Sequence, residues 1–428
     1  MRISPAALLL GLCLTAAGAN DAVVETDNPQ PLAASEDDEG LLQADLIELR
    51  DVFVKIGDFN GALGPAEQVV ARTSQQVGDS DPDLVPALNV LAKIQREIGE
   101  YALAEETYLR SIGILEGRSN KFPPQLIEPY HGLGKTFLAT QKYSAAMTVF
   151  DQARHVSRRN LGLFNIDQIA IIDDQTAALL GLGDVPAAGE LQRDRLHLAI
   201  RTFGENNPEV APYHYQLAAY YASSRLKNRA REEYQRALEV LSADSGENST
   251  ELLPPLTAII ALNMGNRDTG VEAVRIRSIL DSNDDIPAIQ RAQALASLGD
   301  WHLVRLNNVE DAFSYYRAAY ATAPADERAS LFSAPVMLNF IPPMIHISQR
   351  KARDLRTGFG TISLEFTVNR DGTTSEARVV TITPPDSVEA DYLERLSAAR
   401  FRPRFIDGEP ASTQRTRMNH RFWYFAKK

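Results

Sequence analysis

The stretch YHGLGKTFLATQKYSAAMTVFDQA, residues 130–153, decides the fold of the central part of this chain. Its apolar and small residues recur at spacings of three, four and seven, which is the pattern of one buried face on each of two helices. These residues are Tyr130, Leu133, Gly134, Phe137, Tyr143, Ala146, Phe150 and Ala153. A short turn around Gln141 separates the two helices, so the stretch predicts an antiparallel helical hairpin.

This hairpin is one unit of a repeat of 42 residues. Five alanines lie at this spacing: Ala62, Ala104, Ala146, Ala188 and Ala230. Leucines thirteen residues before four of them, and glycines five residues before three of them, keep the same register. Neither apolar stripe can be buried within a single hairpin, so successive units must stack on one another. The sequence therefore predicts an α-solenoid.

The order of Leu, Gly or Ala, Tyr, Gly, Tyr, Ala, Tyr or Phe, and Ala along the units resembles the tetratricopeptide repeat (TPR) family. The 42-residue period is similar to that of kinesin light chain repeats. The resemblance covers roughly residues 41–245, and a later unit is expected around Ala312, Tyr316, Ala319 and Pro324. It implies a mainly α fold, with a right-handed solenoid over residues 41–324 whose helix count between 242 and 300 stays open.

Arrays of this family bind protein partners on the concave surface lined by the first helix of each hairpin. The resemblance places five polar residues on that surface: Asn89, Lys93, Arg96, His131 and Lys135. Ammonium and guanidinium groups form charge-assisted hydrogen bonds, so this cluster would bind a peptide carboxylate or an acidic segment. The alternative is that these residues form an ordinary solvated helix face.

After a proline-rich segment, expected to be a linker or a domain entry at residues 325–350, the pattern changes to that of strands. Ile362, Leu364, Phe366 and Val368 alternate with polar residues, which is typical of a half-buried strand. The pair Asp371-Gly372 favours a hairpin turn, with the second strand over residues 377–383. A helix with an apolar stripe then leads to a closing strand rich in aromatic residues. The predicted order is β-hairpin, helix, strand.

This ordered set resembles the C-terminal domain of the TonB family. The residues that carry the likeness are Gly360, strand 361–368, Asp371-Gly372, the helix end Ala399-Arg400-Phe401-Arg402-Pro403, Gly408 and the aromatic last strand. The resemblance implies a small α+β domain over residues 351–428. The Tyr-Pro pair that usually precedes the first strand in this family is absent, so the start of the domain stays open.

In the TonB family the final strand lies at a sheet edge and pairs with an extended peptide from an outer-membrane receptor. By position, the resemblance implies that Arg417, Asn419, Arg421 and Trp423 flank such a groove. The alternative is that Trp423 and Phe425 close the small core while the arginines face water.

The first nineteen residues fit a secretory signal peptide, with a cation at Arg2, an apolar run over 6–17 and a small-residue ending at Ala19. We expect an acidic flexible segment over residues 20–40, and a periplasmic protein with no membrane span after cleavage. The alternative is an uncleaved inner-membrane anchor, although the apolar run is shorter than the roughly 20 residues that span hydrocarbon. The intact mass of the exported protein separates these two hypotheses.

Charge and motifs exclude several functional classes. Residues 351–428 hold 14 Lys and Arg against 10 Asp and Glu, whereas residues 1–350 hold 30 against 46. An acidic array is unsuited to the phosphate backbone, so no nucleic acid is expected. The chain has one cysteine, Cys13 in the signal peptide, and no HExxH motif. We therefore expect no metal, no cofactor and no catalysis.

Together these patterns predict a non-enzymatic periplasmic scaffold. The TPR array would bind one protein, and the TonB-like domain would bind another protein of the cell envelope, such as an outer-membrane receptor. The alternative is a TonB-type energy transducer for outer-membrane transport, which requires the N-terminal segment to be retained as an anchor.

Overall fold

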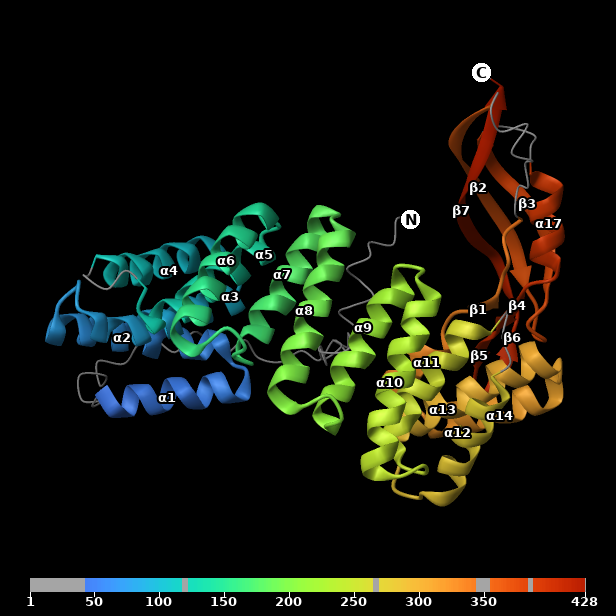
Figure 1. The fold of residues 1–428 in the computed structure, drawn as a ribbon, viewed down its shortest axis with the longest axis horizontal. Helices are drawn as coiled ribbons and strands as arrows, with labels where there is room; N and C mark the ends of the chain where they lie inside the picture. The colour runs from blue at the N-terminus through green and yellow to red at the C-terminus, as the bar shows by residue number, and fades with distance from the viewer. Residues whose placement is uncertain (1–42, 118–121, 265–268, 344–354, 384–387, 428) are drawn as a thin grey trace, which may run out of the picture. The chain divides into compact units, whose positions relative to one another are not determined.

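The computed structural model describes residues 43–117, 122–264, 269–343, 355–383 and 388–427 (Figure 1). The signal peptide and acidic segment predicted over residues 1–40 lie outside these ranges. The chain forms two compact units, residues 1–226 and 227–428. Their boundary falls in the turn between the helix that ends at Ser223 and the helix that begins at Lys227.

The described part of the first unit is helical. Its helices are α1 (Gln43–Ile56), α2 (Phe59–Val77), α3 (Val85–Glu97), α4 (Tyr101–Glu116), α5 (Ile127–Ala139), α6 (Tyr143–Leu161), α7 (Gln168–Leu182), α8 (Val185–Phe203) and α9 (Ala211–Ser223). Short 3-10 turns lead into three of them: η4 (Pro82–Leu84), η5 (Pro124–Leu126) and η6 (Pro208–Val210). From α1 to α8 each odd-numbered helix packs on the next as a hairpin, and each hairpin contacts the following one. The predicted stack of helical hairpins is confirmed.

Local sequence explains both the close packing and the turns. All five repeat alanines are fully buried, because a methyl group is the largest side chain that such close helix approach accepts. In each repeat, a residue one or two positions after the first helix adopts a positive φ; these are Gly57, Gly99, Gln141, Gly183 and Arg225. Gly is favoured there because it has no β-carbon to clash with the left-handed backbone. Gln141 and Arg225 show that the turn keeps this conformation even without Gly.

The second unit begins with further helices. They are α10 (Lys227–Ser245), η7 (Thr250–Leu252), α11 (Leu253–Asn263), α12 (Gly270–Ser282), α13 (Ala288–Trp301), the π-helical turn η8 (His302–Leu306), α14 (Val309–Thr322) and α15 (Ala325–Phe332). The later repeat unit predicted from Ala312 and Tyr316 is the hairpin α13–α14, in which both side chains are fully buried.

The strands and a short helix complete the second unit. They are β1 (Val336–Asn339), β2 (Leu355–Val368), β3 (Thr374–Thr383), α17 (Glu389–Ser397), β4 (Arg400–Arg402), β5 (Arg404–Ile406), β6 (Glu409–Ala411) and β7 (Thr413–Lys427). A three-stranded antiparallel sheet has the order β3-β2-β7, so β7 lies at an edge. Two small ladders pair β1 with β4 and β5 with β6. The predicted sequence of β-hairpin, helix and strand is present in β2, β3, α17 and β7.

One face of the three-stranded sheet is covered by α17. The predicted alternation places Ile362, Leu364, Phe366 and Val368 in a buried core. The helix adds Tyr392 and Leu396, and the last strand adds Phe422. The opposite face of the sheet carries mainly polar side chains, together with the exposed Phe359.

The strands are held on the helices by a second, separate contact. Phe405 of β5 is buried among Phe313 and Tyr316 of α14 and Phe332 of α15. Beside it, Arg402 donates to both carboxylate oxygens of Asp300 on α13, from Nε at 2.9 Å and from Nη2 at 2.6 Å.

This ion pair is almost completely enclosed. Arg402 is 9% exposed and Asp300 is 6% exposed. The Tyr316 hydroxyl donates to Asp300 at 2.8 Å, and the Arg402 guanidinium lies over the Tyr316 ring. Burial opposes the charge on Arg402, but its pKa is raised because Asp300 stabilises the guanidinium.

The sequence predicted a linker or the entry to the strand domain at residues 325–350. The structure has α15 and β1 within that range, and β1 pairs with β4. Phe405 and Arg402 are buried against the last helices. The helices from Lys227 onward and the strands thus form one compact unit.

Candidate partner-binding surfaces

The first helices of successive hairpins lie side by side in the first unit, where α3 contacts α5 and α5 contacts α7. The 42-residue period therefore aligns equivalent residues into rows across these helices. One row contains Asn89, His131 and Asp173. Asn89 is buried and donates to Glu128 on α5 at 3.2 Å, and His131 Nε2 lies 2.7 Å from the Asp174 carboxylate on α7. This row is thus largely occupied by contacts between neighbouring repeats.

The second row contains the two predicted lysines. Lys93 on α3 and Lys135 on α5 are both exposed and stand one repeat apart. Arg96 donates to Glu97 at 2.7 Å, and its side chain is mostly covered. Of the five predicted groove residues, Lys93 and Lys135 are the two whose charges face solvent, whereas Asn89, Arg96 and His131 have partners within the array.

The sequence did not predict a cluster of polar and aromatic side chains around Asp173 of α7, the last residue of the first row. Arg195 of α8 lies 2.9 Å from Asp173, bonds Gln216 of α9 and stacks on the ring of Tyr213. The 42-residue spacing from His131 to Asp173 is the signal that could have found it. Burial raises the pKa of the Asp173 carboxyl to about 6, although Arg195 lowers it, and the neighbouring Asp174 raises it again.

This pKa predicts a pH-dependent stability. The ordinary pKa of an aspartate is about 3.9, so between pH ~4 and ~6 the folded chain holds a proton on Asp173 that the unfolded chain does not. Protonation therefore adds stability as the pH falls through about 6. We expect Asp173→Asn to raise the thermal midpoint, relative to the unchanged chain, by more at pH ~8 than at pH ~5. A difference in midpoint that is the same at both pH values contradicts this prediction.

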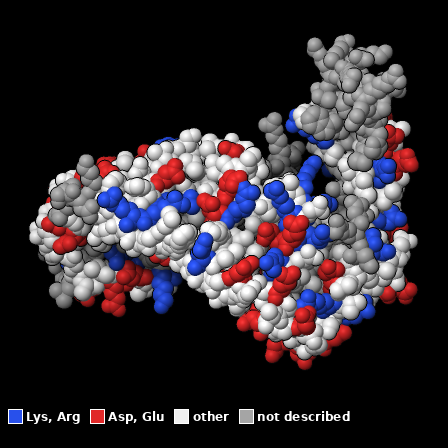
Figure 2. Space-filling view, in the orientation of Figure 1, with Lys and Arg blue, Asp and Glu red and all other residues white. Residues whose placement is uncertain are grey.

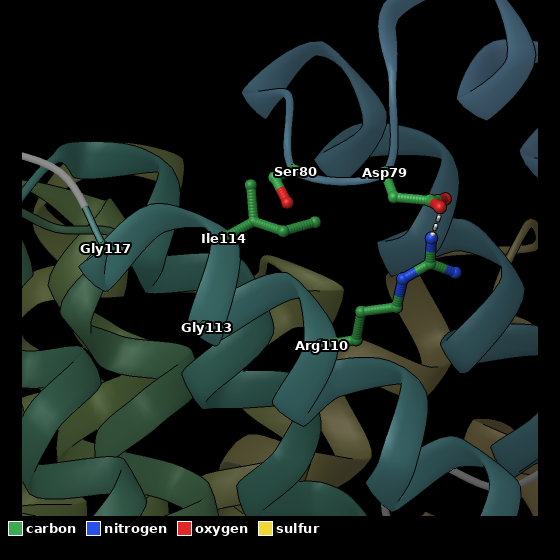
Figure 3. Close-up of a pocket in the computed structure, with 6 residues that line it drawn as sticks. All are labelled: Asp79, Ser80, Arg110, Gly113, Ile114 and Gly117. Atoms are coloured by element: carbon green, nitrogen blue, oxygen red, sulfur yellow. Dashed lines mark hydrogen bonds and ion pairs between the residues drawn. The ribbon is translucent and has the colours of Figure 1, made fainter.

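An open depression of about 500 Å³ lies between the loop that follows α2 and the helix α4 (Figure 3). It is lined by Asp79, Ser80, Arg110, Gly113, Ile114 and Gly117. Arg110 points toward Asp79 and donates to its carboxylate at 2.9 Å, so the two charged groups of the depression neutralise each other. This depression therefore presents no unpaired charged side chain among its lining residues to a ligand.

The edge strand β7 carries the other predicted site. Arg417, Asn419 and Arg421 alternate along it and are all exposed, opposite Glu365, Ser363 and Thr361 of β2. Met418, His420 and Phe422 face the covered side, and the Tyr392 hydroxyl lies 2.7 Å from His420 Nδ1. The backbone of Trp423 pairs with Phe359, but its side chain lies outside what the structure describes. No other strand of the described residues pairs with the free edge of β7.

On the sheet face away from α17, one buried carboxylate binds two arginine side chains. Glu365, 5% exposed, accepts hydrogen bonds from Arg378 of β3 and from Arg417, whose Nε lies 3.0 Å from Oε2. The hydrogen bonds from these two arginines hold the pKa of the Glu365 carboxyl below its ordinary value. The arginine side chains remain mostly exposed, at 70% and 66%.

The described residues contain no group of three or more His, Cys, Asp or Glu side chains that could hold a metal ion. Within the same ranges, no helix is both long and apolar enough to cross a bilayer. On the face seen in Figure 2, Lys and Arg side chains are interspersed with Asp and Glu.

No protein-family model matches the chain, and no curated protein does either. Among solved structures, the chain is similar to the TPR-like repeats of a putative kinesin light chain from Podospora anserina. The sequence identity is 18%, the TM-score is 0.42, and the match covers 47% of this chain and 95% of that chain. A TPR repeat-containing protein from Cytophaga hutchinsonii is similar at 13% identity over 61% of this chain and 89% of that chain, with a TM-score of 0.41.

The apo form of RapI is similar at 12% identity over 65% of this chain and 85% of that chain, with a TM-score of 0.45. TM-scores below 0.5 are too low to assign a partner or a role. The repeat architecture of this chain therefore rests on its own buried alanines, its periodic turns and its stacked helical hairpins.

Proposed function

We propose that this chain is a non-enzymatic scaffold of the bacterial periplasm. Its helical repeats bind one protein, and its strand region, a TonB-like domain, binds a second protein of the cell envelope by strand addition to β7. The observation that carries the proposal is the side-by-side packing of α3, α5 and α7, which presents Lys93 and Lys135 to solvent in one row.

The lysine row suits an acidic or C-terminal peptide segment. Two ammonium groups at equivalent positions of adjacent repeats can bind two carboxylates of one extended peptide, or one carboxylate between them.

The strand region supports the second half of the proposal by its topology. β7 runs over Thr413–Lys427 and lies at the edge of its sheet. An edge strand of this length offers a row of backbone N–H and C=O groups to an incoming strand. An outer-membrane receptor or another envelope complex would supply that strand.

Charge reversal of the lysine row tests the proposed binding surface. We expect the full chain carrying Lys93→Glu and Lys135→Glu to recover its main partner from periplasmic extract with an affinity lowered by about tenfold or more, because two attractive contacts become repulsive. The measurement is quantitative affinity purification followed by titration of the identified partner.

The matched control is the double variant Lys55→Glu and Lys227→Glu, which makes the same change in net charge at two other exposed lysines. If both double variants bind the partner as the unchanged chain does, the lysine row is not the binding surface.

A further inference from the structure

The exposed face of the three-stranded sheet contains a depression of about 290 Å³ on the side away from α17. It is lined by Glu365, Phe366, Thr367, Glu376, Arg378, Gln414 and Arg415. Both neighbours of β2 change register at this level. The pairing with β3 shifts between Glu365 and Thr367 of β2, and the pairing with β7 shifts between Phe366 and Val368. The depression therefore lies where both outer strands bulge at the same level of β2.

The two bulges use an unusual backbone conformation. Glu376 on β3 and Arg415 on β7 both have a φ of +53°, a region that residues with a β-carbon seldom adopt. A β-bulge redirects the side chain of its strand. Arg415 is thereby turned into the depression, beside the neighbouring exposed arginine Arg417.

The arginines of this face are held in place before any partner binds. The buried Glu365 carboxylate accepts from Nε of Arg417, which leaves the outer N–H groups of that guanidinium toward solvent. Four residues along, the Arg421 guanidinium lies 3.7 Å from the centre of the Phe359 ring. Side chains that are already ordered lose less conformational entropy on binding.

The charge on this face is unbalanced in favour of the arginines. Arg378 and Arg417 both pair with Glu365, Arg378 and Arg415 line the depression, and Glu376 accepts from the Thr367 hydroxyl at 2.8 Å. Adding Arg421, the row on β7 presents cations on both sides of Asn419. A partner that approaches this face meets positive charge at Arg415, Arg417 and Arg421 of one strand, with the neutral Asn419 between the last two.

From this geometry we propose that the strand added to β7 carries acidic side chains four residues apart, one bound by Arg415 and Arg417 and the other by Arg421. The proposal rests on the strand addition proposed above and names the chemistry of the added strand. Alternate residues of paired strands face the same side, and directly opposed residues lie about 4.5–5.5 Å apart. Acidic residues at positions i and i+4 of an extended peptide would thus reach both arginine groups, with a polar residue opposite Asn419.

The test uses the full chain and three fluorescein-labelled nine-residue peptides of Thr and Val. One carries Glu at its third and seventh positions, and the second carries Glu at its third and sixth, so that the charge is equal but the two carboxylates point to opposite faces. The third replaces both Glu residues of the first with Gln. We expect the first peptide to bind at least about tenfold more tightly than the other two, as measured by fluorescence anisotropy.

Arg417→Gln and Arg421→Gln should each weaken binding of the first peptide by about tenfold, since each removes a charge-assisted contact. Arg395→Gln, an exposed arginine on α17, is the matched control and should leave the affinity unchanged. Equal binding of the two Glu peptides, equal effects of all three substitutions, or no binding of any peptide at millimolar concentration overturns the proposal.

Backbone N-methylation of the first peptide separates this proposal from strand addition itself. If the methylated peptide binds as tightly and its binding still depends on Arg417, the arginines recognise the acidic side chains but the peptide does not pair with β7 through its backbone. If methylation abolishes binding while the Gln peptide binds as tightly as the Glu peptide, the peptide pairs with β7 but the acidic side chains are not recognised.

Discussion

Arg402→Ala is expected to lower the free energy of unfolding of the second unit by about 3–5 kcal/mol, because it leaves the Asp300 carboxylate buried without its cation. Asp300 would keep the Tyr316 hydroxyl as a donor, but a neutral hydroxyl does not replace a bidentate guanidinium. Both tryptophans of the chain, Trp301 and Trp423, belong to this unit. Urea unfolding followed by tryptophan fluorescence therefore measures the effect.

Two further variants sharpen this result. Replacing the whole cluster, as Arg402→Met with Asp300→Leu and Tyr316→Phe, should recover most of the lost stability, because neither an unpaired charge nor an unsatisfied Tyr316 hydroxyl then remains buried. Arg317→Ala is the control: its ion pair with Glu409 joins the same helices and strands, but both side chains are largely exposed. That substitution should cost less than about 1 kcal/mol. A loss in Arg402→Ala as small as in Arg317→Ala would show that the buried pair does not hold the strands on the helices.

Phe150→Ala should destabilise the first unit by about 3–5 kcal/mol, since the ring is fully buried between α5 and α6 and its removal leaves a cavity. The ring lies directly against Gly134 of α5, where a β-carbon would overlap it. Gly134→Ala alone should therefore be destabilising through overpacking, by about 1–3 kcal/mol. Unfolding followed by far-ultraviolet circular dichroism measures both.

Combining the two substitutions tests whether residue 134 must be Gly because the Phe150 ring occupies the space of its β-carbon. In the Phe150→Ala background, Gly134→Ala should become neutral or stabilising, because the overlap is gone and Ala favours a helix over Gly by about 1 kcal/mol. Gly113→Ala is the control, because a β-carbon at this position of α4 meets no atom within 4 Å. It should stabilise the chain slightly. Additive losses from the two substitutions would argue against a direct contact between residues 134 and 150.

The strand region shows which structural features a local sequence pattern can predict and which it cannot. Period-two alternation predicted the buried face of β2, and the Asp-Gly pair predicted the turn to β3, where Gly372 has a φ of +79°. Alternation alone could not show that β3 and β7 bulge at the same level, because a bulge depends on the register of two strands rather than on either sequence. The depression that gathers Arg378, Arg415 and Glu365 was therefore not predicted.

The candidate groove shows the same division. The repeat period aligned Asn89 with His131, and Lys93 with Lys135, on neighbouring helices. Which of them would face a partner depended on residues of the next repeat, since Glu128 accepts from Asn89 and Asp174 lies against His131. Only Lys93 and Lys135 were left as exposed cations of that predicted set.

The 42-residue repeat was determined by the sequence alone, because the apolar helix face and the small contact residue are local features that recur in every repeat, and a Gly turn accompanies them in three of the five. The tertiary structure decided where the array ends. Arg402 and Asp300 are 102 residues apart in the chain, and neither lies in a pattern that points to the other. Their pairing becomes favourable only when packing around Phe405 removes both from water, so it had to be seen in the folded chain.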